Sequence, residues 1–311
     1  MLRMHSNGRF IRTDKRFLSR QPAPAVTAML VLIVIIAGSA SSGAQSQSPQ
    51  TTAPKAPQAI DQKLPVDPTK KPRLGPEEIA AIKVQNARAA KMNEIVARVN
   101  TAMEVKDWSV VESGSRQLLE MEPGKYSYYS MLGAALLNLE KCEEGLTVLD
   151  KGIQLAQDVT APEDAEAKAK ATTSLMLGYQ GHCYLKQKKS EEAVAAFTKA
   201  EPLDPRPGVV NFNLCATYYN MMVYEKKTLD RERLKAAVAS CNKSIDADSS
   251  RAPAYFIKGA FLIAQTADHH GNVTFPPEAI VAIKKYLELD PKGLYVSGAK
   301  ELLESAGEKV K

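Results

Sequence analysis

The sequence predicts an all-α fold made of stacked helix pairs, and three observations predict it. The 311-residue chain is rich in alanine and only 6% aromatic, which favours helices over a β-sandwich. From Pro76 onward, apolar residues recur at helical spacing and no long alternating strand pattern appears. Segments of this region repeat at an interval of 34 residues. Since one helix pair cannot bury its own apolar face, the repeats are expected to stack.

Residues 1–44 have the three-part layout of an export signal. This segment carries six basic residues against one acidic residue, and the apolar run AVTAMLVLIVIIA at 25–37 follows them before a stretch of small residues. The apolar run is shorter than the roughly 20 residues of a membrane helix, whereas the basic region is long for a signal peptide. We therefore expect either a cleaved signal or an uncleaved transmembrane anchor. Both place the rest of the chain outside the cytoplasm of a bacterial-type cell, in the periplasm or anchored in the inner membrane through this segment.

Residues 45–75 are rich in proline, glutamine, serine and threonine. This composition cannot bury a core and predicts an extended, disordered spacer. The charge after residue 44 is 35 basic against 34 acidic residues, or +1. A nucleic-acid binder concentrates basic residues in its folded part, so the sequence argues against a nucleic-acid partner.

The helical region is expected to span 76–311. Pro76 suits a first helical turn, and Glu77 and Glu78 face the positive end of the helix dipole. The clearest repeat lies at 174–205. Its characteristic small, aromatic and proline residues are Gly181, Tyr184, Ala193, Phe197, Ala200 and Pro205. We expect five units, at 92–125, 126–159, 174–207, 208–251 and 252–292, where the last two carry insertions of ten and eight residues. The stretch 157–173 between two units is compatible with an extended helix.

These marks resemble the tetratricopeptide-repeat (TPR) family over residues 92–292. The resemblance implies a right-handed α-solenoid of about five helix pairs. It also implies a capping helix at 293–310 whose outer face is polar. Gly133, Gly181 and Gly259 mark places where the two helices of a pair approach closely. Small residues on the second helices, at Ala193, Ala237 and Ala279, are expected to face them.

The resemblance also implies a function, which is binding a partner protein in a concave groove lined by the first helices. By helical phase, the candidate groove residues are Asn100, Asn138, His182, Phe212, Asn213, Tyr219, Asn220 and Phe256. Periodicity leaves a second interpretation open for the aromatic residues, which is core packing between neighbouring helix pairs. The groove lacks the basic set that holds a chaperone's terminal carboxylate, because Leu175 and Tyr179 stand at two of its places. The expected partner is an apolar or mixed protein segment.

Other candidates for chemistry are few. Cys215 and Cys241 lie on the two helices of one unit, where they either form a disulfide or pack as small apolar side chains. Cys142 is placed at a turn between helices and Cys183 on a first helix. Asp268-His269-His270 has metal-ligand chemistry but too few ligands for a site.

No catalytic motif is present in the sequence. We therefore expect a non-catalytic scaffold or assembly factor without cofactor, metal or catalytic residues. Two alternatives stay open: an envelope enzyme that uses Cys215, Cys241 or the His269-His270 pair, and a structural brace in an envelope complex.

Overall fold

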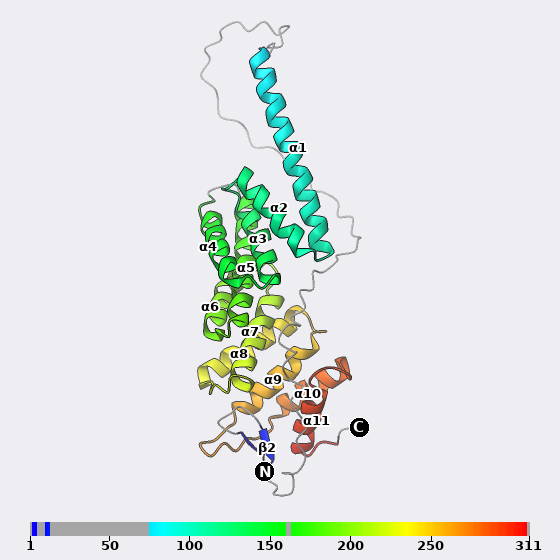
Figure 1. Cartoon of the computed structure of the whole chain (residues 1–311). Helices are drawn as coiled ribbons and strands as arrows, with labels where there is room; N and C mark the ends of the chain where they lie inside the picture. Colours follow the sequence, from blue (N-terminus) through cyan, green and yellow to red (C-terminus); the bar gives the residue numbers. More distant parts are fainter. Residues whose placement is uncertain (1, 5–9, 13–74, 160–162, 310–311) are drawn as a thin grey trace, which may run out of the picture. The chain divides into compact units, whose positions relative to one another are not determined.

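The computed structural model describes residues 2–4, 10–12, 75–159 and 163–309. Within these residues eleven α-helices follow one another (Figure 1). Their bounds are α1 Pro76–Glu104, α2 Trp108–Met121, α3 Tyr126–Asn138, α4 Cys142–Gln157, α5 Glu163–Lys186, α6 Ser190–Ala200, α7 Gly208–Val223, α8 Arg231–Ala247, α9 Ala252–Ala264, α10 Pro277–Leu289 and α11 Val296–Ser305. A short 3-10 helix, Glu201–Leu203, follows α6. The predicted all-α solenoid is confirmed.

Two short strands lie within the predicted export segment, which the sequence analysis did not expect to contain strands. β1 (Leu2–Met4) pairs with β2 (Phe10–Arg12) in antiparallel register, with Leu2 opposite Arg12. The apolar run at 25–37 and the proline-rich spacer at 45–74 lie outside the described residues. Among the helices described, none combines the length and the apolar character needed to cross a membrane.

The contacts divide the chain into two units, residues 1–13 with 84–311, and residues 14–83. Of the second unit, the structure describes the start of α1. Pro76 takes the first helical position, and the backbone N–H of Gly75 donates to the Glu78 carboxylate over 2.8 Å, which satisfies a donor that the helix itself leaves open. The predicted helix start is therefore present.

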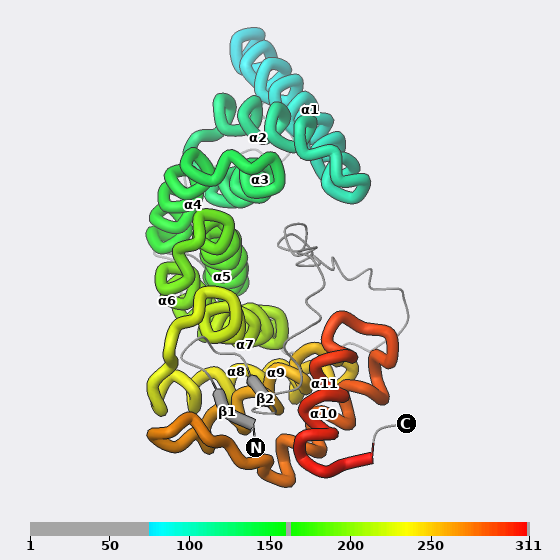
Figure 2. Tube along the Cα trace, turned by 60° about the horizontal axis from the view of Figure 1, so that its bottom comes forward, coloured from blue at the N-terminus to red at the C-terminus, as the bar shows by residue number. Residues whose placement is uncertain are grey.

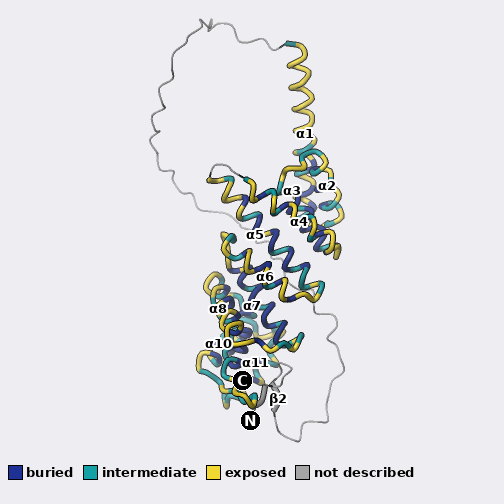
Figure 3. Tube along the Cα trace, turned by 90° about the vertical axis from the view of Figure 1, so that its left-hand side faces the viewer, coloured by how far each residue is buried: buried dark blue, intermediate teal, exposed yellow. Residues whose placement is uncertain are grey.

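From α3 to α10, each odd-numbered helix packs against the helix that follows it, and successive pairs stack. The last part of α1 packs on α2, where Val99 lies against Gly114. Figure 2 shows α3, α5 and α7 on one side of the stack and α4 and α6 on the other. A large core cluster extends from α5 to α11, and a separate cluster joins α1, α2 and α3. In Figure 3 buried residues occur along the stacked helices, whereas the first half of α1 is exposed. This neighbour-to-neighbour burial is what a stack of repeats requires.

Close helix approach is achieved by a glycine that faces one large side chain. A Cβ on Gly181 would lie 2.5 Å from the ring of Phe197, and a Cβ on Gly259 would lie 2.6 Å from Ile283. Gly133 faces Leu149 in the same way. The expectation that Ala193 and Ala279 face these glycines was incomplete, because the large residue four positions later, Phe197 or Ile283, occupies the space. Four positions after Ala237 stands Cys241, which is bonded to Cys215.

Tight turns end four of the first helices without glycine. Lys106, Glu140, Lys188 and Lys226 each adopt a positive φ between 58° and 63°. Because each of these residues has a Cβ, it adopts the left-handed region at a steric cost that glycine would avoid. Two of these turns, at Lys106 and Glu140, lie 34 residues apart, which is the interval of the repeat.

One boundary differs from the sequence prediction, and one is as the sequence allowed. The capping helix α11 is shorter than the expected 293–310, because residues 291–295 form turns before it. The stretch before the third unit lengthens α5, which begins at Glu163 and runs for 24 residues. Its alanines, glutamates and lysines are good helix formers, which explains the extension.

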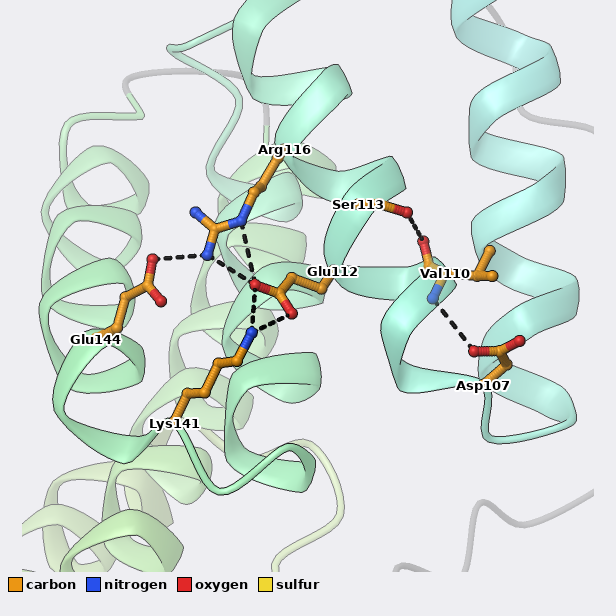
Figure 4. A network of polar contacts seen from close by, with 7 residues as sticks. All are labelled: Asp107, Val110, Glu112, Ser113, Arg116, Lys141 and Glu144. Carbon is orange, nitrogen blue, oxygen red and sulfur yellow. Dashed lines mark hydrogen bonds and ion pairs between the residues drawn. The ribbon is translucent and has the colours of Figure 1, made fainter.

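A polar network ties α2 to the beginning of α4 (Figure 4). The Glu112 carboxylate, whose side chain is 15% exposed, accepts hydrogen bonds from Lys141 Nζ at 2.7 Å and from Arg116 Nη2 at 2.9 Å. Arg116 Nη2 also reaches Glu144 over 2.6 Å. The hydrogen bond from Lys141, followed by that from Arg116, lowers the pKa of Glu112. The network thus connects the first helix pair with the second.

Candidate partner-binding site

The candidate site lies on the side of the stack formed by α3, α5, α7 and α9, which we call the first-helix face. Along this side, α3 packs on α5 and α7 packs on α9. Side chains that project from this side come from several repeats. This arrangement allows one extended segment of a partner to contact more than one repeat.

The predicted groove residues differ in exposure. Asn100 is exposed, whereas Asn138, His182, Phe212 and Asn220 are half-buried. The amide of Asn138 donates to the Ala134 carbonyl of its own helix over 2.7 Å. Of this group, Asn100, Phe212 and Asn220 keep side-chain surface for a partner.

Three predicted groove residues are buried, so their assignment to an open groove was wrong. Tyr219, Phe256 and Asn213 are only 8%, 4% and 7% exposed. Tyr219 and Phe256 belong to the large core cluster, with ring centroids 6.0 Å apart in an edge-to-face arrangement. The alternative interpretation of these two aromatic residues as core packing is the one that the structure supports. Sequence periodicity does not show which residues cover a face.

Two exposed apolar residues on first helices were not predicted as partner contacts from the sequence. Leu175 on α5 is 49% exposed and Val209 on α7 is 53% exposed. They stand 34 residues apart, at the same place in successive repeats. Val209 also lies one turn before Phe212, so both point to the same side of α7. The repeat interval, applied to this position, was the sequence signal that could have found them.

Phe212 has a cationic neighbour. The guanidinium carbon of Arg251 lies 5.3 Å from the centre of the Phe212 ring, within the range of a cation–π contact. Arg251 also pairs with Asp248 over 3.0 Å, which holds the guanidinium in place. The surface around Phe212 is therefore apolar with one fixed positive group beside it.

His182 lies at the interface between two neighbouring repeats. Its Nε2 is 3.3 Å from the amide nitrogen of Asn213, and its ring meets Phe197 edge-on at 5.3 Å. Because the amide nitrogen only donates, Nε2 acts as acceptor and the ring is neutral. Burial first, and the charge of Lys186 second, lower the pKa of His182 to about 4. His182 is thus a packed, neutral contact rather than a charged groove residue.

This environment of His182 predicts that acid lowers the stability of the protein. Between pH 6.5 and 4 the unfolded chain binds a proton at His182 that the folded chain excludes, so the free energy of unfolding falls as the pH falls. We expect a loss of about 2 kcal/mol over this range. His182→Gln should remove most of that loss, measured by urea unfolding at pH 7.5 and pH 4.5. The exposed His270 provides the control. If His270→Gln changed the pH dependence as much as His182→Gln did, the assignment would be refuted.

The structure pairs the four cysteines of the sequence. Cys215 on α7 and Cys241 on α8 form a disulfide with Cα atoms 5.0 Å apart, and both are fully buried. Cys142 and Cys183 form a second disulfide, with Cα atoms 5.2 Å apart. The sequence analysis placed Cys142 at a turn and missed this second pair. Cys142 begins α4 and Cys183 lies on α5, so the bond joins two successive repeats.

The histidine-containing loop supports no metal centre in the structure. The Asp268 carboxylate accepts hydrogen bonds from the backbone N–H groups of His270 and Asn272, each at 2.8 Å, and from the Asn272 amide. These bonds close the loop and occupy the carboxylate. Across the described residues, no three side chains of metal-ligand type come together.

Comparison with known proteins agrees with the helix pairs seen in the structure. Residues 180–207, which contain the Phe197 helix, match the model of the tetratricopeptide repeat. No curated protein matches the sequence. PilW, described as a widely conserved type IV pilus biogenesis factor, has a similar structure with a TM-score of 0.50 and 15% identity, over 72% of this chain and 90% of PilW.

Two further solved structures have lower scores. YrrB, described as a TPR protein with an unusual peptide-binding site, has a TM-score of 0.48 and 13% identity, over 69% of this chain and 98% of YrrB. MamA has a TM-score of 0.45 and 17% identity, over 65% of this chain and 92% of MamA. At such identities the likeness concerns the fold alone. The matched repeat at 180–207, together with the stacked helix pairs on either side of it, supports a tetratricopeptide-repeat solenoid.

Proposed function

We propose that this protein is a non-catalytic scaffold that works outside the cytoplasm and binds a segment of a partner protein on the first-helix face of α5 and α7. The observation that carries the proposal is the pair of exposed apolar residues Leu175 and Val209, at equivalent places in neighbouring repeats. Half-buried Phe212 extends the apolar surface from Val209 by one turn. Such a surface suits an apolar or mixed segment in extended or helical form.

A location outside the cytoplasm is supported by the two disulfides and the leader. Disulfides persist in oxidising compartments and are rare in the cytosol. The basic and apolar segments of residues 1–44 have the composition of a signal or an anchor. We propose either a periplasmic protein or one tethered to the inner membrane of a bacterial envelope.

The two alternative functions, a thiol enzyme and a structural brace, require different properties of the protein. A thiol enzyme needs a reactive thiolate, whereas Cys215 and Cys241 are bonded to each other and fully buried. A structural brace would stay with its complex in fixed ratio, whereas a recruiting scaffold releases its partner on dilution. We favour the scaffold, because Leu175 and Val209 are two exposed apolar contacts, whereas a permanent interface usually buries a large hydrophobic area.

The experiment is a cross-linked pull-down from envelope extracts with the full chain and the Leu175→Asp/Val209→Asp double variant. We expect the double variant to capture at least tenfold less partner, because a charge buried against an apolar segment is costly. Val281→Asp is the matched control, since Val281 is 66% exposed on α10, outside the first-helix face. All three positions are exposed, so the variants should fold.

Two outcomes would count against this proposal. Equal loss of partner with Val281→Asp would mean that the surface of α5 and α7 has no special role. Absence of any captured protein with the unaltered chain, under cross-linking, would contradict the scaffold function itself. Capture in a fixed ratio that survives dilution would favour the structural brace.

A further inference from the structure

Tyr295 lies in the turn between α10 and α11, and its ring reaches three earlier helices. Its centroid is 4.5 Å from that of Phe256 on α9, with the two planes only 9° apart, so the rings stack. It is also 5.8 Å from Tyr219 on α7 and 6.0 Å from Tyr286 on α10, both edge-on. A side chain from the end of the chain therefore contacts two repeats at once.

Two of the helices that contact this ring, α7 and α9, are first helices. Helical phase predicts that Tyr219 and Phe256 project toward the first-helix face, yet they are only 8% and 4% exposed. Tyr295 contributes to this burial, because it stacks on one ring and meets the edge of the other. Gly298 adds to the cover, since a Cβ there would lie 3.5 Å from the Phe256 ring. The C-terminal segment thus closes an aromatic site that α7 and α9 would otherwise present.

The segment is held at a place separate from the ring. Ala299, Leu302 and Leu303 of α11 are buried, and α11 packs against α10. Lys284 on α10 pairs with Glu308 over 2.7 Å. Two backbone hydrogen bonds hold the main chain of Tyr295: its N–H donates to the hydroxyl of Tyr286 over 2.7 Å, and its carbonyl accepts from the N–H of Ala299 over 2.8 Å. The ring would therefore leave its site by rotation of the Tyr295 side chain, while α11 stays attached to α10.

We propose that the aromatic site formed by Tyr219 and Phe256 binds an aromatic side chain of the partner, and that Tyr295 occupies the site in the partner's absence. This inference rests on the proposed function and names the partner's chemistry, which is a segment with tyrosine or phenylalanine flanked by small and apolar residues. Residues 293–298, GLYVSG, are the example that the chain itself provides.

The chemistry of the site favours a neutral ring. Stacked and edge-to-face aromatic pairs are favourable at these distances, and a desolvated site of rigid rings is the usual anchor of a protein interface. Burial raises the pKa of Tyr295 to about 12, so its phenol is uncharged at physiological pH. Because Tyr295 belongs to the same chain, its effective concentration at the site is on the order of millimolar. A partner segment must bind the aromatic site well enough to displace Tyr295. The site therefore selects segments with high affinity.

The test uses the full chain and the acetylated, amidated hexapeptide GLYVSG as the probe, with binding followed by fluorescence anisotropy of a labelled form. We expect Tyr295→Ala to bind the probe at least tenfold more tightly than the unaltered chain, because the competing ring is removed. Adding Phe256→Ala should abolish this gain. The probe with alanine in place of tyrosine should bind neither protein. Tyr255→Ala is the matched control, because Tyr255 lies on α9 outside the ring cluster and bonds to the Ser249 carbonyl.

Helicity and thermal unfolding establish that each variant is folded, and Tyr295→Leu, which keeps apolar volume without a ring, replaces Tyr295→Ala if the latter unfolds. Equal binding of the probe to the unaltered chain and to the folded Tyr295 variant would overturn the inference. So would equal binding of the tyrosine and alanine probes.

The envelope pull-down separates this inference from the proposed function. If Tyr295→Ala gains probe binding but no envelope protein is captured by any variant, the aromatic site stands and the scaffold function fails. If a partner is captured equally with and without Tyr295, and the probe does not bind, the scaffold function stands and this inference fails.

Discussion

Phe197→Ala is expected to cost about 3–5 kcal/mol of unfolding free energy, as buried aromatic truncations do. Phe197 is fully buried on α6 and fills the space in front of Gly181 on α5. Removing the ring leaves a cavity between the two helices of the repeat that matches the family model. Urea unfolding followed by circular dichroism measures the loss. Tyr224→Ala, which truncates a ring that is 57% exposed, should cost far less.

A second substitution tests whether the glycine and the ring act as one pair. Gly181→Ala alone should destabilise the protein, because its Cβ would lie 2.5 Å from the Phe197 ring. In the Phe197→Ala background the same change should stabilise by roughly 0.5–1 kcal/mol, because alanine favours a helix and the clash is gone. This change of sign is the signature of direct coupling. Simple additivity of the two effects would show that Gly181 and Phe197 do not share the space between α5 and α6.

The repeat could be predicted from the sequence because its marks are local. The close approach at Gly181 depends on Phe197, 16 positions later in the same helix pair, and the same separation recurs between Gly133 and Leu149. The sequence analysis expected Ala193 to face Gly181, because two small residues also allow a close approach. In the structure the residue that faces Gly181 is Phe197. Both features concern only neighbouring helices, where periodicity is informative.

The candidate site was only partly predictable because it depends on contacts between distant residues. Tyr219 and Phe256 have the helical phase of groove residues, but Tyr295 covers them from the end of the chain. Likewise, Cys142 and Cys183 are 41 residues apart on different repeats, so no single helix pair predicts their bond. Helical phase gives the direction of a side chain on its own helix, whereas burial depends on which other elements lie over it.

Loss of the Cys215–Cys241 disulfide is expected to cost about 3 kcal/mol, because the bond closes a loop with a sequence separation of 26 and restricts the unfolded chain. The variant is Cys215→Ala/Cys241→Ala, compared with the unaltered protein by urea unfolding without reductant. Thiol titration of the unaltered, denatured and unreduced protein should find no free thiol. Detection of two or more thiols in protein purified from an oxidising compartment would contradict the pairing.

The repeat itself supplies a sharper control for this disulfide. Cys215 stands where the other first helices have Gly133, Gly181 and Gly259, and Cys241 lies four residues after Ala237, as Phe197 lies four residues after Ala193. The disulfide therefore takes the place of the glycine and large-residue pair that the other repeats use. Cys215→Gly/Cys241→Leu would copy the Gly133 and Leu149 pair.

We expect Cys215→Gly/Cys241→Leu to be more stable than the double alanine variant, because leucine fills the space between α7 and α8 that two alanines leave empty. It should remain less stable than the disulfide-bonded protein, because the unfolded chain is no longer closed into a loop. Adding reductant should destabilise the unaltered protein, whose Cys142–Cys183 bond would also open, by more than it destabilises either variant. If the glycine and leucine variant were no better than the double alanine variant, the bond would not occupy the packing position of the repeat. The disulfide would then have been added to an independently packed helix pair, rather than replacing the contact that holds the other pairs together.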